Sequence, residues 1–355
     1  MKRNSKLKSK NSKVTSQKSK LSAFFPFNFS WFLLFTFSFL LNSLAPNSAL
    51  ALGDLPPVPE KVINPTMSYV QTFGTPGSGE RQFYYPQDIK VAQIGDLSTA
   101  LDNLYVIDSG NNRVQRLDEN GGFVYQFGGF GHDDGKFNTP DGIAVDFNFR
   151  IYVSEKDNDR IQQFDIRGNF LREIGAGEVN LKTLQNPAGM DVDALGYLYV
   201  ADAGNDRVLK FDSQGNYSAE LGGFGVGPGF FNKPLDVAVD RDRNVYVADT
   251  GNNRIQKFDF DGQPLLSFGQ AGSGPGDLAS PGSVAVDYNF IYVADTGNNR
   301  VCLFSKQGKF LLAFGRKGSG PGEFSGPLGI SLGKQGRVYV ADSGNHRIVE
   351  LKVAY

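Results

Sequence analysis

Residues 245–255 read Val-Tyr-Val-Ala-Asp-Thr-Gly-Asn-Asn-Arg-Ile, and this pattern recurs five more times along the 355-residue chain. Successive copies are 46 or 47 residues apart, and in every copy the arginine follows the tyrosine by 8 residues. The tyrosines are Tyr105, Tyr152, Tyr199, Tyr246, Tyr292 and Tyr339. A fixed period of this length is typical of repeat architectures, in which each repeat is one supersecondary unit.

Each repeat reads as four short strands. In the third copy, Leu198–Val200 is a strand rich in β-branched and aromatic residues, and Asp202–Asp206 has the residue types of a tight turn. Val208–Asp212 is the returning strand, and a strand that starts at a proline precedes each tyrosine motif. Six units of four antiparallel strands without a helical period predict an all-β fold, a six-bladed β-propeller.

The two ends of the repeat array are expected to complete one blade together. The last repeat stops at Tyr355, before a fourth strand can form, and an orphan copy of that strand lies at Tyr69–Gly74. Phe73 precedes Pro86 by 13 residues, the same spacing as in the other repeats. Since an open ring would expose two sheet edges, we predict that the N-terminal strand closes the last blade of a propeller spanning 67–355.

The N-terminal region has a different composition. Residues 1–20 carry eight basic groups and no acid, residues 21–51 carry no charge, and Ala49-Leu50-Ala51 follows the Phe/Leu-rich run. This order predicts a secretory signal peptide over 1–51, with an uncleaved membrane anchor as the alternative. Either one places the remainder outside the cytoplasm, periplasmic, secreted or anchored. Residues 52–66 are proline-rich and read as a linker.

The charge of the remaining chain bears on its partners. Residues after 51 carry 28 basic and 37 acidic groups, a net charge of −9. This balance disfavours a phosphate backbone as partner, so no nucleic acid is expected. Cys302 is the only cysteine, which excludes an intramolecular disulfide, and its strand context predicts a small buried apolar residue.

The repeated motif, followed by Phe-Asp and Phe-Gly, resembles the NHL repeat over about Tyr69–Tyr355. The resemblance implies a six-bladed propeller that in most members is a binding platform; uses known in the family include protein partners, single-stranded RNA, sensor modules and a zinc-dependent peptide lyase. The second copy departs from the pattern: Glu155 replaces the aspartate, and Asp157 stands where glycine is usual, so we expect strain in that turn.

The in-phase acids and arginines have two interpretations. They could form a basic, RNA-gripping ring, or each arginine could pair with the acid of its own or an adjacent turn and link the blades; the second is preferred because the two residue types repeat together. The set is Asp108, Arg113, Arg160, Asp202, Arg207, Asp249, Arg254, Asp295, Arg300, Asp342 and Arg347.

The sequence offers few of the residue types that an enzymatic site would need. The chain has only His132 and His346, both expected in solvent-facing loops, and a zinc site of three histidines cannot be built from one chain. The carboxylates are more informative. Just after each strand-opening proline, a side chain should approach the channel mouth, which brings together Asp88, Asp141, Asp236 and Ser283. Such acids suit a cationic ligand or Ca²⁺, with Asp88 and Asp236 as the metal candidates; the alternative is a solvated strand start or a bond to a neighbouring loop.

These observations favour an exported, non-enzymatic propeller that binds a protein, peptide or glycan, without a cofactor unless Ca²⁺ binds at the mouth, and that meets a membrane only through its N-terminal segment. A metal-assisted lyase or hydrolase using the mouth acids is the alternative. RNA binding is a third, disfavoured hypothesis.

Overall fold

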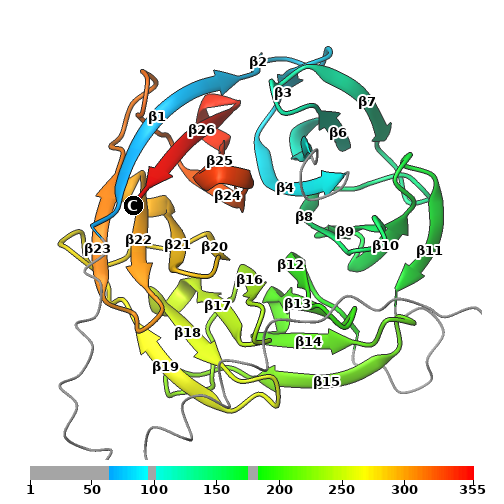
Figure 1. Ribbon diagram of the computed structural model, residues 1–355. Coiled ribbons are helices and arrows are strands. Elements are labelled where there is room, and N and C mark those ends of the chain that lie inside the picture. Colours follow the sequence, from blue (N-terminus) through cyan, green and yellow to red (C-terminus); the bar gives the residue numbers. More distant parts are fainter. Residues whose placement is uncertain (1–63, 95–100, 175–182) are drawn as a thin grey trace, which may run out of the picture. The chain divides into compact units, whose positions relative to one another are not determined.

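The computed structural model describes residues 64–94, 101–174 and 183–355. Within these residues the chain forms six four-stranded antiparallel sheets arranged as blades around a central axis (Figure 1), which confirms the predicted six-bladed propeller. The expected signal peptide or anchor, 1–51, and residues 52–63 of the expected linker lie outside the described residues, and the first strand begins at Thr66.

The blades follow one another along the chain, and the four strands of each blade are named below in order from the axis outward. The strands are β4 (Pro86–Ile94), β5 (Leu101–Asp108), β6 (Arg113–Leu117) and β7 (Phe123–Gly128) in blade 1; β8 (Pro140–Val145), β9 (Ile151–Glu155), β10 (Arg160–Phe164) and β11 (Phe170–Ile174) in blade 2; and β12 (Pro187–Val192), β13 (Leu198–Asp202), β14 (Arg207–Phe211) and β15 (Tyr217–Gly222) in blade 3. The later strands are β16 (Asp236–Val239), β17 (Val245–Asp249), β18 (Arg254–Phe258) and β19 (Pro264–Phe268) in blade 4; β20 (Ser283–Val286), β21 (Phe290–Asp295), β22 (Arg300–Ser305) and β23 (Phe310–Phe314) in blade 5; and β24 (Pro327–Leu332), β25 (Arg337–Asp342), β26 (Arg347–Ala354) and β1 (Thr66–Phe73) in blade 6.

Short elements lie between these strands. A parallel pair, β2 (Thr75–Pro76) and β3 (Gln82–Phe83), forms in the segment that joins β1 to blade 1. Single 3-10 turns follow the second strand of every blade except blade 2: η1 (Ser109–Asn111), η2 (Ala203–Asn205), η3 (Thr250–Asn252), η4 (Thr296–Asn298) and η6 (Ser343–Asn345), with η5 (Lys334–Gly336) in the β24–β25 hairpin. Among the described residues, no helix has the length and apolar content to cross a bilayer.

The core consists of apolar layers between neighbouring blades. Tyr199 of blade 3 packs with Phe231, Val247 and Phe258 on the facing side of blade 4, and all four side chains are buried. Both faces of a blade are therefore apolar, as the unbroken apolar runs of the strands predict. Four of the segments that join the blades contribute a phenylalanine to these layers, and all four side chains are fully buried: Phe83, Phe137, Phe231 and Phe324.

The ring is closed by its first and last strands. β1 pairs antiparallel with β26, with Phe73 opposite Ile348 and Tyr69 opposite Leu351. Phe73 is 2% exposed and packs against Tyr339 and Ile348. The predicted closure of the last blade is therefore confirmed, and it joins the two ends of the described chain in one sheet.

The innermost strands β4, β8, β12, β16, β20 and β24 surround the axis (Figure 1). They begin at the end of the ring where the turns before the six arginines also lie, because Pro86 is opposite Asp108 and Pro187 is opposite Asp202. We call this end the mouth face. The hairpin tips between each first and second strand lie on the opposite face. In blade 1 the tyrosine follows the strand-opening proline by 19 residues, against 11 or 12 in the other blades, and residues 95–100, between β4 and β5, fall outside the described residues.

Candidate functional site

The turns on the mouth face are held by buried ion pairs. In each turn the arginine Nε donates to the carboxylate of the same turn: at 2.7 Å in five blades, and at 2.6 Å in blade 2, where Glu155 is the acid. The pairs are Asp108–Arg113, Glu155–Arg160, Asp202–Arg207, Asp249–Arg254, Asp295–Arg300 and Asp342–Arg347.

The same arginines also link the turn to the segment that enters its blade. Arg254 Nη2 donates to the carbonyls of Gly227 and Phe230 at 2.8 and 2.9 Å. The acid partners are fully buried, and the arginine side chains are at most 14% exposed. A guanidinium whose donors are used in this way has little left to offer a phosphate, so the geometry favours the structural role over an RNA-binding ring.

The turn of blade 2 is not strained as the sequence suggested. Asp157 has no left-handed backbone, so the expected strain is absent. Glycine at this position in the other blades serves close approach: a Cβ at Gly251 would lie 2.6 Å from the carbonyl oxygen of Asn232. Blade 2 avoids this clash by pairing Lys156 N, one residue earlier, with Thr139 O. The change places a lysine at the mouth.

The four predicted mouth residues line one cavity. Asp88, Asp141, Asp236 and Ser283 surround a volume of about 140 Å³ together with Lys156, Lys233, Leu235 and the glycines of the inner strands. The two lysines were not predicted. A second cavity of about 180 Å³ continues along the axis and shares Asp88 and Asp236 with the first. These two acids therefore stand between the mouth and the interior of the channel.

The mouth acids also bind the neighbouring blades. Asp88 Oδ2 accepts the backbone N–H of Ile143 in blade 2 at 2.9 Å. Asp236 Oδ2 accepts the hydroxyl of Ser283 at 2.5 Å and the N–H of Val284 at 3.0 Å, both in blade 5. Ser283 Oγ in turn accepts the N–H of Ile330 in blade 6. The expected alternative of a bond to a neighbouring segment is thus present, and it holds the inner strands together.

Burial changes the acidity of these carboxyls. Burial raises the pKa of Asp236 to about 7, against bonds from Ser283, Val284 and Val237 that favour the ionised form. Burial, with the charge of Asp236 as the next cause, also holds the pKa of Asp88 well above its ordinary value. The two residues come from opposite blades and line the same two cavities. Both carboxyls therefore hold a proton more readily than an exposed aspartate does, and the ionised form of each disfavours the ionised form of the other.

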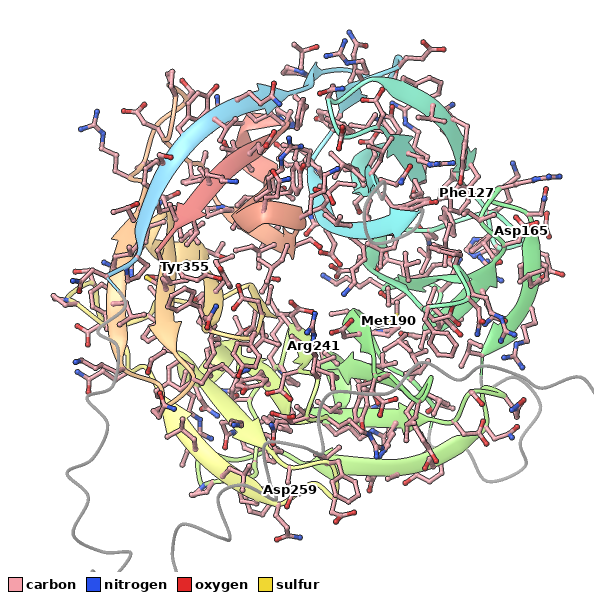
Figure 2. All side chains as sticks on the ribbon, in the orientation of Figure 1. Phe127, Asp165, Met190, Arg241, Asp259 and Tyr355 are labelled. Carbon is pink, nitrogen blue, oxygen red and sulfur yellow. The ribbon has the colours of Figure 1, made fainter. Side chains whose placement is uncertain are left out.

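Asp141 lines the same mouth cavity, together with Lys156 and Lys233. Burial raises the pKa of Asp141 to about 6, and the positive charges of Lys156 and Lys233 oppose the shift. Farther inside the channel, Lys90 Nζ of β4 lies 2.6 Å from Asp191 Oδ1 of β12, so an ion pair spans from blade 1 to blade 3. Met190, beside Asp191, lies near the centre of the ring in Figure 2.

A metal site receives no added support from the arrangement. Among the described residues, no group of three or more His, Cys, Asp or Glu side chains is close enough to hold a metal ion. Calcium at Asp88 and Asp236 stays a prediction, with two carboxylates that are both engaged by backbone N–H groups.

Neither histidine lies at the channel. His132 is exposed, and its Nδ1 lies 2.6 Å from Asn158 Oδ1. His346 is half-buried rather than solvent-facing: its Nδ1 accepts the N–H of Tyr85 at 3.0 Å, and its ring stacks on Tyr84. In the other blades an Asn or Asp side chain accepts the equivalent N–H, as Asn253 does from Ser280. His346 therefore serves the seam between blades 6 and 1.

Cys302 is fully buried within the layer between blades 4 and 5. Burial raises the pKa of its thiol to about 12, so it stays a neutral thiol. The expected role as a small buried apolar residue is confirmed.

Comparisons with solved structures agree on the fold. A virginiamycin B lyase from Staphylococcus aureus superposes with a TM-score of 0.52 at 15% identity, covering 81% of this chain and 99% of that one. A gluconolactonase from Xanthomonas campestris gives 0.56 at 18%, covering 78% and 88%. An auxiliary nutrient binding protein from Bacteroides thetaiotaomicron gives 0.59 at 14%, covering 82% and 77%. Identities this low show the fold alone.

Comparisons at the sequence level bear on the family. No curated protein matches the chain. One family model, described as a 6-bladed beta-propeller, matches residues 276–353, and the model of the NHL repeat matches residues 231–258. The second match covers the motif around Tyr246, which the structure repeats in all six blades. The chain thus carries an NHL repeat and folds as a six-bladed β-propeller.

Proposed function

We propose that this NHL-repeat propeller is an exported binding module that takes a protein, peptide or glycan partner at the mouth face. One observation carries the proposal: residues from four blades, Asp88, Asp141, Asp236 and Ser283, converge on one cavity at the end of the channel. Concave sites with a few convergent polar groups are where ligands usually bind. The N-terminal segment, with its basic start and apolar run, supports export.

A block of the mouth tests this function for any class of ligand. Leu235 lines the cavity from blade 4, and a Leu235→Trp substitution would fill the space without changing charge. Tyr288, 81% exposed, lies in the β20–β21 hairpin on the opposite face, so Tyr288→Ala is the matched control. The full-length chain and both variants would each carry an affinity tag and be cross-linked to their partners in the source cells. The partners captured with each protein would then be compared.

We expect the wild type and the Tyr288→Ala variant to capture the same cell-envelope partner and the Leu235→Trp variant to lose it. Melting temperatures of the three proteins establish that the variants fold. Capture that survives the mouth block and depends on Tyr288 would place the binding surface on the opposite face. Export is checked by adding a protease to cells whose outer boundary has been permeabilised. If the protease leaves the propeller intact there, the propeller is not exported.

Acid–base catalysis is a second candidate, because one observation favours it. Carboxyls with raised pKa values in a cavity are typical of catalytic acids and bases, and Asp88, Asp141 and Asp236 meet this description. The captured partner, or the part of it that enters the mouth, would then be cleaved. Mass spectrometry after incubation with the wild type and with an Asp236→Ser variant checks this; an intact partner in both reactions favours binding alone.

A further inference from the structure

The cavity at the mouth continues outward over blade 3. A neighbouring cavity of about 340 Å³ shares Asp141, Lys156, Lys233 and Leu235 with it. Its floor is made by the inner end of blade 3, with Ala188, Ala203 and Gly204. The two spaces form one depression that runs from the axis across blade 3, and its size suits a small ligand or the end of a chain rather than a folded surface.

Lys156 and Lys233 reach this depression from either side of blade 3. Lys156 replaces a small residue in the altered turn of blade 2; the equivalent positions hold Ser109, Ala203, Thr250, Thr296 and Ser343. Lys233 precedes Pro234 and has a left-handed backbone, with φ of 49°. Both side chains are exposed, and both act on Asp141 electrostatically.

The depression holds charged side chains of both signs. Lys156 and Lys233 line both spaces, and within the described residues neither makes an ion pair shorter than 4.0 Å. Asp141 and Asp206 line the outer space; Asp206 Oδ1 accepts the N–H of Lys233, and no described group bonds the carboxylate of Asp141. Asp88 and Asp236 line only the axial part. A ligand with a cationic group and an anionic group would therefore find a partner for each, with the cationic group toward the axis.

The lining also bears on the choice between a glycan and a peptide. Among the residues that the structure describes, no aromatic side chain lines either of the two spaces, and Leu235 and Leu328 are their large apolar residues. The apolar faces of sugar rings stack on aromatic side chains, whereas a peptide end needs charged partners and hydrogen bonds. The lining therefore favours a peptide.

We propose that the mouth binds a peptide segment that carries a primary ammonium and a carboxylate, with the ammonium between Asp88 and Asp236 and the carboxylate between Lys156 and Lys233. The ammonium comes from a peptide N-terminus or a lysine side chain, and the carboxylate from an acidic side chain or a C-terminus. This inference rests on the proposed binding function and adds the chemistry of the ligand.

Proton linkage gives the proposal a sharp signature. Burial raises the pKa of both Asp88 and Asp236, and an ammonium between them favours their ionised forms, so binding of a cationic probe becomes stronger as the pH rises. A carboxylate beside Lys156 and Lys233 is repelled by ionised Asp141, so binding of an anionic probe weakens as the pH rises through about 6. Two further groups of charges lie nearby: Lys90 and Asp191 of the channel form an ion pair with each other, and Asp206 of the outer space accepts the N–H of Lys233.

Four synthetic probes separate these contributions in titration calorimetry with the full-length protein. Glycyl-glutamyl-glycine amide carries both charged groups. Its N-acetyl form lacks the ammonium, and glycyl-glutaminyl-glycine amide lacks the carboxylate. N-acetyl-glutamyl-glycyl-lysine amide moves the ammonium to a side chain. We expect each peptide that lacks one group to bind about tenfold more weakly than the first, which corresponds to the loss of one charge-assisted contact.

The variants use residues that other blades carry at the same positions. Lys156→Thr follows Thr250 and Thr296; Lys233→Asn follows Asn186, which also has a left-handed backbone; Asp88→Ser follows Ser283, whose Oγ still accepts a neighbouring N–H. Lys309→Asn on the opposite face is the charge-matched control. Each mouth variant should weaken the first probe about tenfold, and the control should leave its affinity unchanged.

Equal binding of the free and acetylated forms of the first probe, together with no gain from the lysine probe, would overturn the ammonium part. Unchanged affinity in both lysine variants would overturn the carboxylate part. Neither result touches the proposed binding function, because capture of the envelope partner and its loss in Leu235→Trp do not depend on ligand charge. The binding function itself would instead be contradicted if the wild type captured no partner, or if Leu235→Trp captured the same partner as the wild type.

Discussion

One position in the repeat, two residues after each strand-opening proline, decides how neighbouring blades meet at the axis. It holds Asp88, Asp236 and Ser283, whose side chains bind the N–H of the next blade. It holds glycine in the other three blades. A Cβ at Gly189 would lie 2.0 Å from Asp236 Oδ1, and one at Gly329 would lie 2.4 Å from Asp88 Oδ1. Each carboxylate thus occupies space that only glycine in the preceding blade leaves free.

The raised pKa of Asp236 predicts a pH dependence of stability. Below about pH 4 this carboxyl is protonated in both the folded and unfolded states. Between that pH and about 7, the folded state retains a proton that the unfolded state has lost, so the free energy of unfolding falls as the pH rises. We expect Asp236→Ser to remove a decline on the order of 4 kcal/mol, measured by urea unfolding from pH 4 to 8.

Asp240 supplies the control with the opposite sign. Burial alone would raise the pKa of Asp240, but bonds from Asn244 and Lys306 lower it overall. Its contribution is present above about pH 4 and is lost as the pH falls, so Asp240→Ser should reduce stability at pH 7 more than at pH 3. The same pH slope in the Asp236→Ser variant and in the wild type would contradict the assignment of Asp236.

At the scale of the element, the turn before each arginine is the unit that links one blade to the next. Its acid is bonded by the arginine, by the asparagine of the turn and by the backbone of the entering segment, as Asp249 is by Arg254, Asn252 and Asn232 N. Its glycine lets the entering segment approach. Blade 2 shows that the turn tolerates another sequence if the backbone pairing moves by one residue.

The close approach in this turn predicts a steric cost. Gly251→Ala would place a Cβ 2.6 Å from the carbonyl oxygen of Asn232, so the entering segment must move and its bond from Gly251 N is weakened. We expect a loss of about 2 kcal/mol in the free energy of unfolding, measured by urea denaturation. Thr250→Ser in the same turn keeps the hydroxyl that donates to Pro281 O and should be close to neutral. If Gly251→Ala leaves the free energy of unfolding unchanged, the close approach of the entering segment is not the reason why glycine occupies this position.

At the scale of the whole molecule, stability depends on closing the ring. The layer between blades 6 and 1 is built from residues at both ends of the described chain, including Phe73 and Ile348. Because each blade buries its faces only against its neighbours, losing one strand at the seam exposes two blade faces and two sheet edges. The ring should therefore unfold cooperatively from a weakened seam.

Two substitutions in β1 test the closure. Phe73→Ala removes a side chain that is 2% exposed in this layer and should lower the free energy of unfolding by about 3 kcal/mol, with a lower melting temperature. Val70→Ala, in the same strand but 44% exposed, should change it little. Equal, small effects of the two substitutions in thermal unfolding would mean that β1 does not stabilise the ring as argued.

The sequence by itself determined the number of blades, the closure by β1, the pairing of each turn arginine with an acid and the positions of the mouth acids. These features follow from local patterns, because strand alternation, turn residues and a fixed period repeat in every unit. Only the tertiary structure decided that burial and mutual charge raise the pKa of Asp88 beside Asp236, that Lys156 and Lys233 share the mouth cavity with Asp141, and that His346 holds the seam. Those contacts join side chains from different blades, and they exist because ring closure buries them together, which is also what raises the pKa values of the acids.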